Sequence, residues 1–207
     1  MFFGISYEEF FYLYKEILKI LIIFLAGMVA YRFSVLNRLR EEKLVKKQAC
    51  TDPLTGGGNR NLFLKEIDIL IKKGDKFALC FMDLDGFKQI NDTMGHDAGD
   101  ELLKRLYKTL SQVLPKNGSA YRLGGDEFAI AISETDKEAV RVGIEQVIRN
   151  TQEWDFTADG CGKKMTCSCG VVHIEKCIHP IELIHQSTKA LIEAKRMGRN
   201  QYRWYEL

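Results

Sequence analysis

Apolar residues near the N-terminus form one long stretch rather than a periodic face. Residues 10–31 read FFYLYKEILKILIIFLAGMVAY, and a helix rising about 1.5 Å per residue over this length crosses a bilayer. The charges Lys15, Glu16 and Lys19 lie in its first half, where lysine reaches the interface and offsets the acid. The pattern predicts a membrane-spanning helix within residues 1–32. Because of the three charges, an amphipathic dimerisation helix in a soluble protein is the alternative.

The flanking charges predict an orientation for this helix. Glu8 and Glu9 precede the apolar stretch, and the residues that follow it are basic: Arg32, Arg38, Arg40, Lys43, Lys46 and Lys47. The positive-inside rule therefore predicts a single-pass protein of the inner or cell membrane, with the C-terminal side in the cytoplasm. Residues 33–50 contain good helix formers and neither Gly nor Pro, so we expect a helical linker that also serves dimerisation. Its heptad pattern is weak.

From residue 51 the pattern becomes that of a globular domain, residues 51–207. The Asp52-Pro53 pair ends the preceding helix, because proline disfavours a helical predecessor. Helical periodicity predicts helices over 59–73, 96–114, 136–154 and 180–197, and apolar runs predict strands over 77–84, 165–174 and 201–205, with a hairpin over 120–132. A central hairpin in place of strict alternation predicts an α+β fold, with a mostly antiparallel sheet flanked by helices.

Composition limits the classes of function. The 30 Lys and Arg nearly balance the 28 Asp and Glu, so the chain carries no general signal for nucleic acid. The six cysteines include no CxxC pair, and we interpret them as reduced structural thiols. The alternative, a metal site, would draw on Cys161, Cys167, Cys169, Cys177, His173 and His179.

Two acidic pairs stand where the predicted strands end. Asp83 and Asp85 close the strand over 77–84, and Asp126-Glu127 lies at the hairpin turn. If the two strands are adjacent, these carboxylates crowd together, which is costly unless a cation neutralises them. Oxygen ligands of this kind suit Mg²⁺ and two-metal phosphoryl transfer. Solvated turn acids are the alternative reading for either pair alone.

Two further features suit a phosphate-bearing substrate. Gly124-Gly125 precedes the hairpin acids and lets the backbone approach a phosphate, although an ordinary hairpin also favours this pair. Lys195 and Arg199 are four residues apart near the end of the last predicted helix. That spacing places both cations on one face, where they can bind polyphosphate oxygens.

Five motifs in order now resemble the GGDEF family of diguanylate cyclases. YRLGGDEFAI at 121–130 resembles the family's signature, and MDLDGFKQINDTMGHDAGDELL at 82–103 resembles its long central motif. DPLTG with Asn59-Arg60, TCSCG, and AKRMGRN resemble the opening, the TxSxG and the closing motifs. Five motifs at sensible spacing are far more specific than one.

The resemblance implies a palm-like sheet of the nucleotide cyclase and polymerase type, with GTP as the substrate. It implies Mg²⁺, with Mn²⁺ as the alternative metal, held by Asp83, the Leu84 carbonyl, Asp126 and Glu127. Asp126 and Glu127 would be the catalytic residues, and Asp126 would receive the 3′-hydroxyl proton. The implied substrate-binding residues are Phe87, Lys88, Asn91, Asp100, Gly124, Gly125, Lys195 and Arg199. Asn91 and Asp100 would read the guanine edge, whose N–H donors adenine lacks.

The resemblance also implies a homodimer, in which each 3′-hydroxyl attacks the α-phosphate of the other GTP and pyrophosphate leaves. Pairing of the N-terminal helices would raise the effective concentration of the two half-sites. The chain departs from the family at Gly57, where Leu is typical, and we expect a looser opening loop there. It also carries PKNG (residues 115–118) in place of the inhibitory RxxD motif, so we expect no product inhibition at that site.

Two other functions stay open. One is a catalytically silent GGDEF-like module that binds GTP or a partner; retention of the acids and of the closing cations argues against it. The other is a relative that makes a hybrid cyclic dinucleotide, against which Asp100 retains the guanine acceptor. The input signal is not readable from the chain.

Overall fold

The computed structural model describes residues 7–133, 136–152, 154, 165–174 and 179–205, and the chain divides after Gln48 into two units. The first unit contains α1, Tyr7–Gln48, a single helix that joins the predicted span to the predicted linker without a break. Lys19 Nζ donates to Glu16 Oε1 at 2.6 Å, so the internal acid is paired as expected. Within α1, Tyr7–Glu41 has the length and composition of a membrane span, with a mean hydropathy of 1.9. The same exposed surface suits a helix that pairs with another chain, so membrane insertion stays a prediction.

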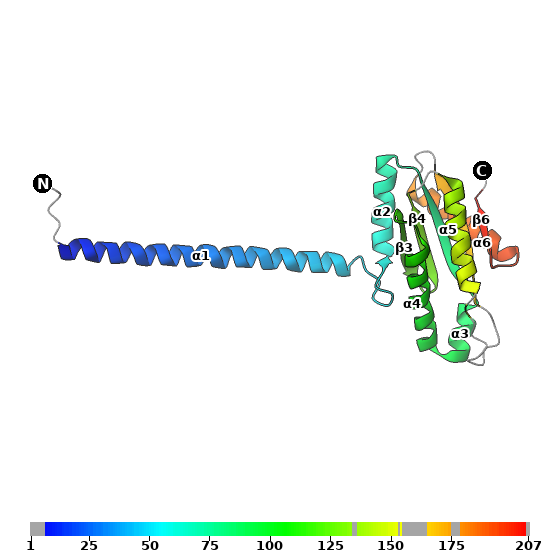
Figure 1. The fold of residues 1–207 in the computed structure, drawn as a ribbon, viewed down its shortest axis with the longest axis horizontal. Coiled ribbons are helices and arrows are strands. Elements are labelled where there is room, and N and C mark those ends of the chain that lie inside the picture. Colours follow the sequence, from blue (N-terminus) through cyan, green and yellow to red (C-terminus); the bar gives the residue numbers. More distant parts are fainter. Residues whose placement is uncertain (1–6, 134–135, 153, 155–164, 175–178, 206–207) are drawn as a thin grey trace. The chain divides into compact units, whose positions relative to one another are not determined.

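The second unit is a six-stranded sheet with five helices (Figure 1). Its elements are β1 (Gly58–Asn59), α2 (Arg60–Lys73), β2 (Phe77–Asp85), α3 (Phe87–Met94), α4 (His96–Val113), β3 (Gly118–Gly124), β4 (Glu127–Ile132), α5 (Lys137–Gln152), β5 (Thr166–Ile174), α6 (Pro180–Arg196) and β6 (Tyr202–Trp204). The strand order is β1-β3-β4-β2-β5-β6. The predicted α+β class is confirmed.

The sheet is mixed, which refines the prediction of a mostly antiparallel one. The four central strands pair antiparallel. At the edges, β1 runs parallel to β3 and β6 runs parallel to β5. Both edge strands are short, so their direction left little pattern in the sequence.

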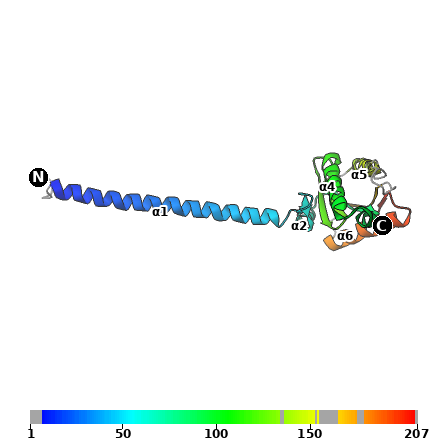
Figure 2. The ribbon, with the colours of Figure 1, turned by 90° about the horizontal axis from the view of Figure 1, so that it is seen from below.

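Helices cover both faces of the sheet. α4 and α5 lie on one face, with α2 and α6 on the other, as Figures 1 and 2 show together. Side chains of β2 alternate between the faces: Met82 and Leu84 pack on the α4/α5 side, and Leu79 and Phe81 on the α2/α6 side. By the same alternation Asp83 and Asp85 continue the α2/α6 face of β2 beyond its apolar part.

Local chemistry explains most helix boundaries. The Asn59 side chain accepts from the Asn61 and Leu62 N–H groups at 2.9 and 3.1 Å, so Asn59 caps α2 instead of opening it. The Asp136 carboxylate accepts from the Glu138 N–H at 2.9 Å, which confirms the predicted cap of α5. Helix α3 was missed, because Gly86 and Gly95 on either side of it resemble loop residues. Both have positive φ, 84° and 87°, and allow sharp entry and exit.

Three of the described thiols are packing groups, and Cys50 is a part-buried thiol that accepts from Lys65 Nζ at 3.2 Å. Cys80, Cys167 and Cys169 are buried free thiols in the sheet core. Hydrogen bonding with Cys167 and Cys80, together with burial, raises the pKa of Cys169. Cys161 and Cys177 lie outside the described residues, so the alternative cysteine–histidine metal site is not testable as a whole. His179 caps α6, accepting from the Ile181 N–H at 3.3 Å.

Candidate functional site

Strand register brings the two acidic pairs together. Asp83 on β2 is the direct cross-strand partner of Glu127 on β4, so the two side chains share the α2/α6 face. Asp126 lies in the turn just before β4, close enough to raise the pKa of Asp83 by charge repulsion. Gly125 takes φ of 54°, a conformation that favours glycine, and the pairing of β3 with β4 shifts register just before it. The predicted convergence of the acids is therefore present.

Asp83 is the electrostatic centre of this cluster. Burial raises its pKa and Asp126 and Asp85 raise it further, whereas Lys195 acts in the opposite direction. Lys195 Nζ lies 2.7 Å from Asp83 Oδ1, and the lysine and aspartate side chains are 33% and 15% exposed. Lys195 on α6 thus forms an ion pair with a largely buried member of the acid cluster.

Asp85 has a role that the sequence analysis did not assign. Its side chain is 5% exposed and accepts hydrogen bonds from Thr166 Oγ1 and Ser168 Oγ, both at 2.8 Å. It also accepts from the Asn200 N–H at 3.1 Å, and Arg199 Nε lies 3.9 Å away. Asp85 therefore ties the end of β2 to β5 and to the segment after α6 that carries Arg199. The spacing of Thr166 and Ser168 on one strand face was the available signal.

A second unassigned pair holds the hairpin from the other side. Arg122 Nη1 lies 3.2 Å from both carboxylate oxygens of Asp52, and Arg122 Nε donates to the Gly125 carbonyl at 2.9 Å. The arginine and aspartate side chains are 15% and 13% exposed. Burial raises the pKa of Asp52, but hydrogen bonds from Thr55 and the Arg122 guanidinium outweigh it, and the pKa is lowered. Arg122 thereby connects the loop after α1 to the turn beside Asp126.

The predicted guanine-reading residues lie on α3 and α4. Asn91 Oδ1 is buried and has no hydrogen-bond partner among the described residues, so its capacity to accept a hydrogen bond is unused in this structure. A Cβ at Gly99 would lie 1.9 Å from Asn91 Oδ1 and 3.1 Å from Phe87 Cζ, so this glycine lets α3 and α4 approach. Asp100 and Lys88 are exposed on these helices.

The acidic cluster fits a divalent cation by its donor set. It offers carboxylate oxygens, and burial, followed by repulsion from Asp126 and Asp85, raises the pKa of Asp83, which Lys195 partly offsets. Within the part of the chain that the structure describes, no three His, Cys, Asp or Glu side chains are already arranged around a metal position. The metal-ligand assignments of Asp83, Leu84, Asp126 and Glu127 remain predictions.

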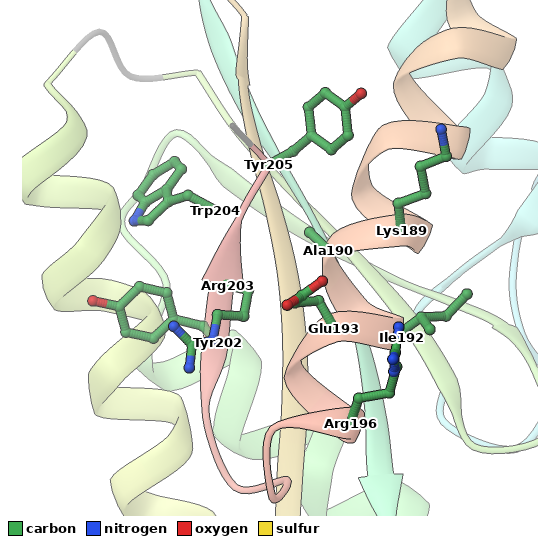
Figure 3. Close-up of a pocket in the computed structure, with 9 residues that line it drawn as sticks. All are labelled: Lys189, Ala190, Ile192, Glu193, Arg196, Tyr202, Arg203, Trp204 and Tyr205. Carbon is green, nitrogen blue, oxygen red and sulfur yellow. The ribbon is translucent and has the colours of Figure 1, made fainter. Parts of the chain in front are cut away.

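Among the hollows on the α2/α6 side, a cavity of about 160 Å³ adjoins Glu127 and is lined by Arg60, Phe81, Leu123, Thr188 and Leu191 among others. A groove of about 730 Å³ lies between α6 and β6, where Glu193 and Arg196 on the helix flank Arg203 on β6 and Tyr205 just after it (Figure 3). No predicted site residue lines this groove. We therefore place the candidate site at the acid cluster and not at the groove.

Comparison with known proteins shows what most of the chain resembles. The family model described as "Diguanylate cyclase, GGDEF domain" matches residues 49–201. The probable diguanylate cyclase DgcT of Escherichia coli (strain K12) is 32% identical over 184 residues, 86% of this chain and 40% of that protein. The cyclic di-GMP phosphodiesterase PdeB of Shewanella oneidensis is 32% identical over 177 residues, 83% of this chain and 21% of that protein. The chain thus spans less than half the length of either relative.

A solved structure shares the fold. It comprises the coiled coil and GGDEF domain of DgcB from Caulobacter crescentus, in complex with c-di-GMP. The two superpose with a TM-score of 0.77 at 26% identity, and the match covers 87% of this chain and 98% of the other.

Proposed function

The chain belongs to the GGDEF domain family, and we propose that it is a diguanylate cyclase that condenses two GTP into cyclic di-GMP and two pyrophosphates. The observation that carries the proposal is the acid cluster: Asp83 beside Glu127 in register, Asp126 close by, and Lys195 at 2.7 Å from Asp83. Its donor set suits a metal-assisted transfer of phosphorus between oxygens. The similarity to DgcT, named a probable diguanylate cyclase, supports the same reaction.

In this proposal the acids hold a divalent cation and handle one proton. Asp83, the Leu84 carbonyl, Asp126 and Glu127 would hold Mg²⁺ or Mn²⁺, which supplies charge neutralisation for the attacking and leaving oxygens. Asp126 would accept the proton of the attacking 3′-hydroxyl. Arg122 and Asp85 would keep the two strand ends that carry these acids in position.

The substrate would be recognised at its two ends. Asn91, with its buried unpaired acceptor, and Asp100 would accept hydrogen bonds from the N1–H and N2–H₂ groups of guanine. Lys88, Lys195 and Arg199 would bind phosphate oxygens, and the glycine turn at Gly124-Gly125 with Phe87 would line the pocket. Lys195 would then move from Asp83 toward the phosphates as the metal replaces it.

One half-site is incomplete, because cyclisation needs two GTP molecules facing each other. We infer a homodimer whose subunits pair through α1 and bind one GTP each. We also infer that the sheet is of the palm type. The coiled coil that accompanies the GGDEF domain of the similar Caulobacter crescentus protein supports pairing through such a helix. The basic residues Arg32, Arg38 and Arg40 after the apolar part of α1 support a membrane location with the domain in the cytoplasm.

Product analysis tests the proposal. The purified full-length chain, in detergent, is incubated with Mg²⁺ and an equimolar mixture of GTP and ATP, and the nucleotides are resolved by chromatography and mass. Cyclic di-GMP as the sole cyclic product supports the proposal, and a mixed guanine–adenine dinucleotide would indicate the hybrid-product enzyme. GTP binding without any product would indicate the silent module instead.

A further inference from the structure

Gly57 lies in the loop that precedes β1. The ring of Tyr107, from α4, occupies the space that a side chain at this position would take. Gly57 is buried, and a Cβ built on it would lie 2.2 Å from both Cε2 and Cζ of Tyr107 and 2.7 Å from its hydroxyl. Tyr107 comes from α4 and, like Leu54 in the same loop, packs against the core on the α4/α5 face. The Tyr107 ring therefore fills the space beside Gly57, and the loop is packed at the position where we expected it to be looser.

The loop is closed by its own hydrogen bonds, so a group that holds Gly57 also holds Asp52. The Asp52 N–H donates to the Gly57 carbonyl at 2.8 Å, and the Gly56 N–H donates to the Asp52 carbonyl at 2.9 Å. Thr55 donates to the Asp52 carboxylate through its N–H at 2.9 Å and its hydroxyl at 2.8 Å. Displacing Gly57 would strain bonds that fix the Asp52 carboxylate.

From Asp52 the contacts continue to the hairpin turn. Arg122 binds both oxygens of Asp52 at 3.2 Å and donates to the Gly125 carbonyl at 2.9 Å. Gly125 directly precedes Asp126. The contacts of Asp52 with Thr55 and Arg122 are part-buried, whereas the Arg122–Gly125 hydrogen bond is exposed. A contiguous series of packed and hydrogen-bonded groups can carry a small displacement from one end to the other.

We propose that Tyr107 is a positioning residue for Asp126: its ring braces Gly57, and through Asp52 and Arg122 it sets the hairpin turn. The proposal rests on the cyclase function for its kinetic consequence but not for its structural one. Because the ring occupies space that a larger residue at position 57 would fill, Gly57 and Tyr107 form a complementary pair. A larger residue at position 57 would then compensate for loss of the Tyr107 ring.

A double-mutant cycle on the full-length chain tests this. In Tyr107→Ala we expect kcat to fall by about 10-fold or more, because a misplacement of about 1 Å at a reacting group is costly. KM for GTP should change less than kcat, since the guanine-reading residues Asn91 and Asp100 are not in the relay and only Gly125 at its end lines the proposed pocket. Gly57→Leu alone also lowers kcat through its clash with the ring. Gly57→Leu/Tyr107→Ala recovers kcat to within about 3-fold of the parent, a coupling that independent sites do not show.

Two variants serve as controls. Tyr107→Phe retains the ring and keeps parental kcat, and Lys108→Ala, exposed on the same helix, changes nothing. Hydrogen exchange of the Asp52 and Gly56 amides, whose N–H groups donate within the loop, gives a readout that needs no activity. It should rise in Tyr107→Ala and return to parental values in the double variant.

Additive effects in the cycle, or a Tyr107→Ala variant that loses thermal stability but keeps kcat and parental exchange at the Asp52 and Gly56 amides, would overturn the proposal. An inactive parent protein would refute the cyclase function alone. In that case the exchange data still decide the structural relay.

Discussion

Lys195 Nζ lies 2.7 Å from Asp83 Oδ1, so α6 supplies a cation to the acid cluster near the end of β2. This contact joins residues from opposite ends of the domain sequence. Under the proposed function, Lys195 would compete with a metal at Asp83 and, once displaced, would bind phosphate.

Lys195→Met should therefore impair catalysis strongly. We expect kcat/KM for GTP to fall by about 100-fold, near 3 kcal/mol, since the variant removes a phosphate ligand and leaves a partly buried carboxylate unpaired. Steady-state kinetics at saturating Mg²⁺ provide the measurement. The matched control is Lys189→Met on the same helix, which lines the groove beside β6; equal kinetics in the two variants would contradict the role of Lys195.

The Asp52–Arg122 pair predicts a pH-dependent stability. The folded-state pKa of Asp52 is lowered, so its stabilisation is present above the unfolded pKa of about 3.9 and is lost as pH falls through the lower folded value. We expect Asp52→Asn to lower the free energy of unfolding by about 2 kcal/mol at pH 7. That difference should vanish at low pH in denaturant titrations.

Asp68→Asn is the control for this prediction, because its partner Lys72 is largely exposed and such pairs contribute little. A deficit of Asp52→Asn that persists unchanged in acid would mean that packing, not ionisation, is responsible.

Asp85→Asn should affect both stability and substrate binding. The variant loses acceptor capacity for two hydroxyls and the Asn200 N–H, and we expect a loss of about 2 kcal/mol of stability. Release of the segment that carries Arg199 should raise KM for GTP. Thermal unfolding and kinetics measure the two effects, with exposed Asp92→Asn as the control; a destabilised variant with unchanged KM would limit Asp85 to a structural role.

Guanine recognition predicts a glycine effect. Gly99→Ala should displace Asn91, because the new Cβ would lie 1.9 Å from Asn91 Oδ1. We expect KM for GTP to rise by about 10-fold or more, as in Asn91→Ala, since a base-reading hydrogen bond is lost in both. Gly143→Ala, whose Cβ would meet nothing within 4 Å, controls for the substitution itself. Unchanged KM in Gly99→Ala would argue that guanine binds elsewhere.

The sequence predicted the strands and the acid cluster better than it predicted the contacts that hold the acids in position. The apolar run ending at Asp83 and the glycine turn before Asp126 predicted a shared sheet edge, because strand alternation and hairpin chemistry are local properties. The Asp85 and Arg122 contacts join residues far apart in the chain, so the spacing of Thr166 and Ser168 on one strand face was a signal without a visible partner. At Gly57 the sequence predicted a looser loop, whereas the ring of Tyr107 from α4 packs against this position.

The most direct test of the proposed cyclase function is to incubate the full-length chain and its Asp126→Asn variant with GTP and Mg²⁺ and to identify the products by mass. We predict cyclic di-GMP from the parent and none from the variant, although both bind GTP. Cyclic di-GMP at equal rates from both would contradict the catalytic role of Asp126, and no product from either would contradict the proposed cyclase function.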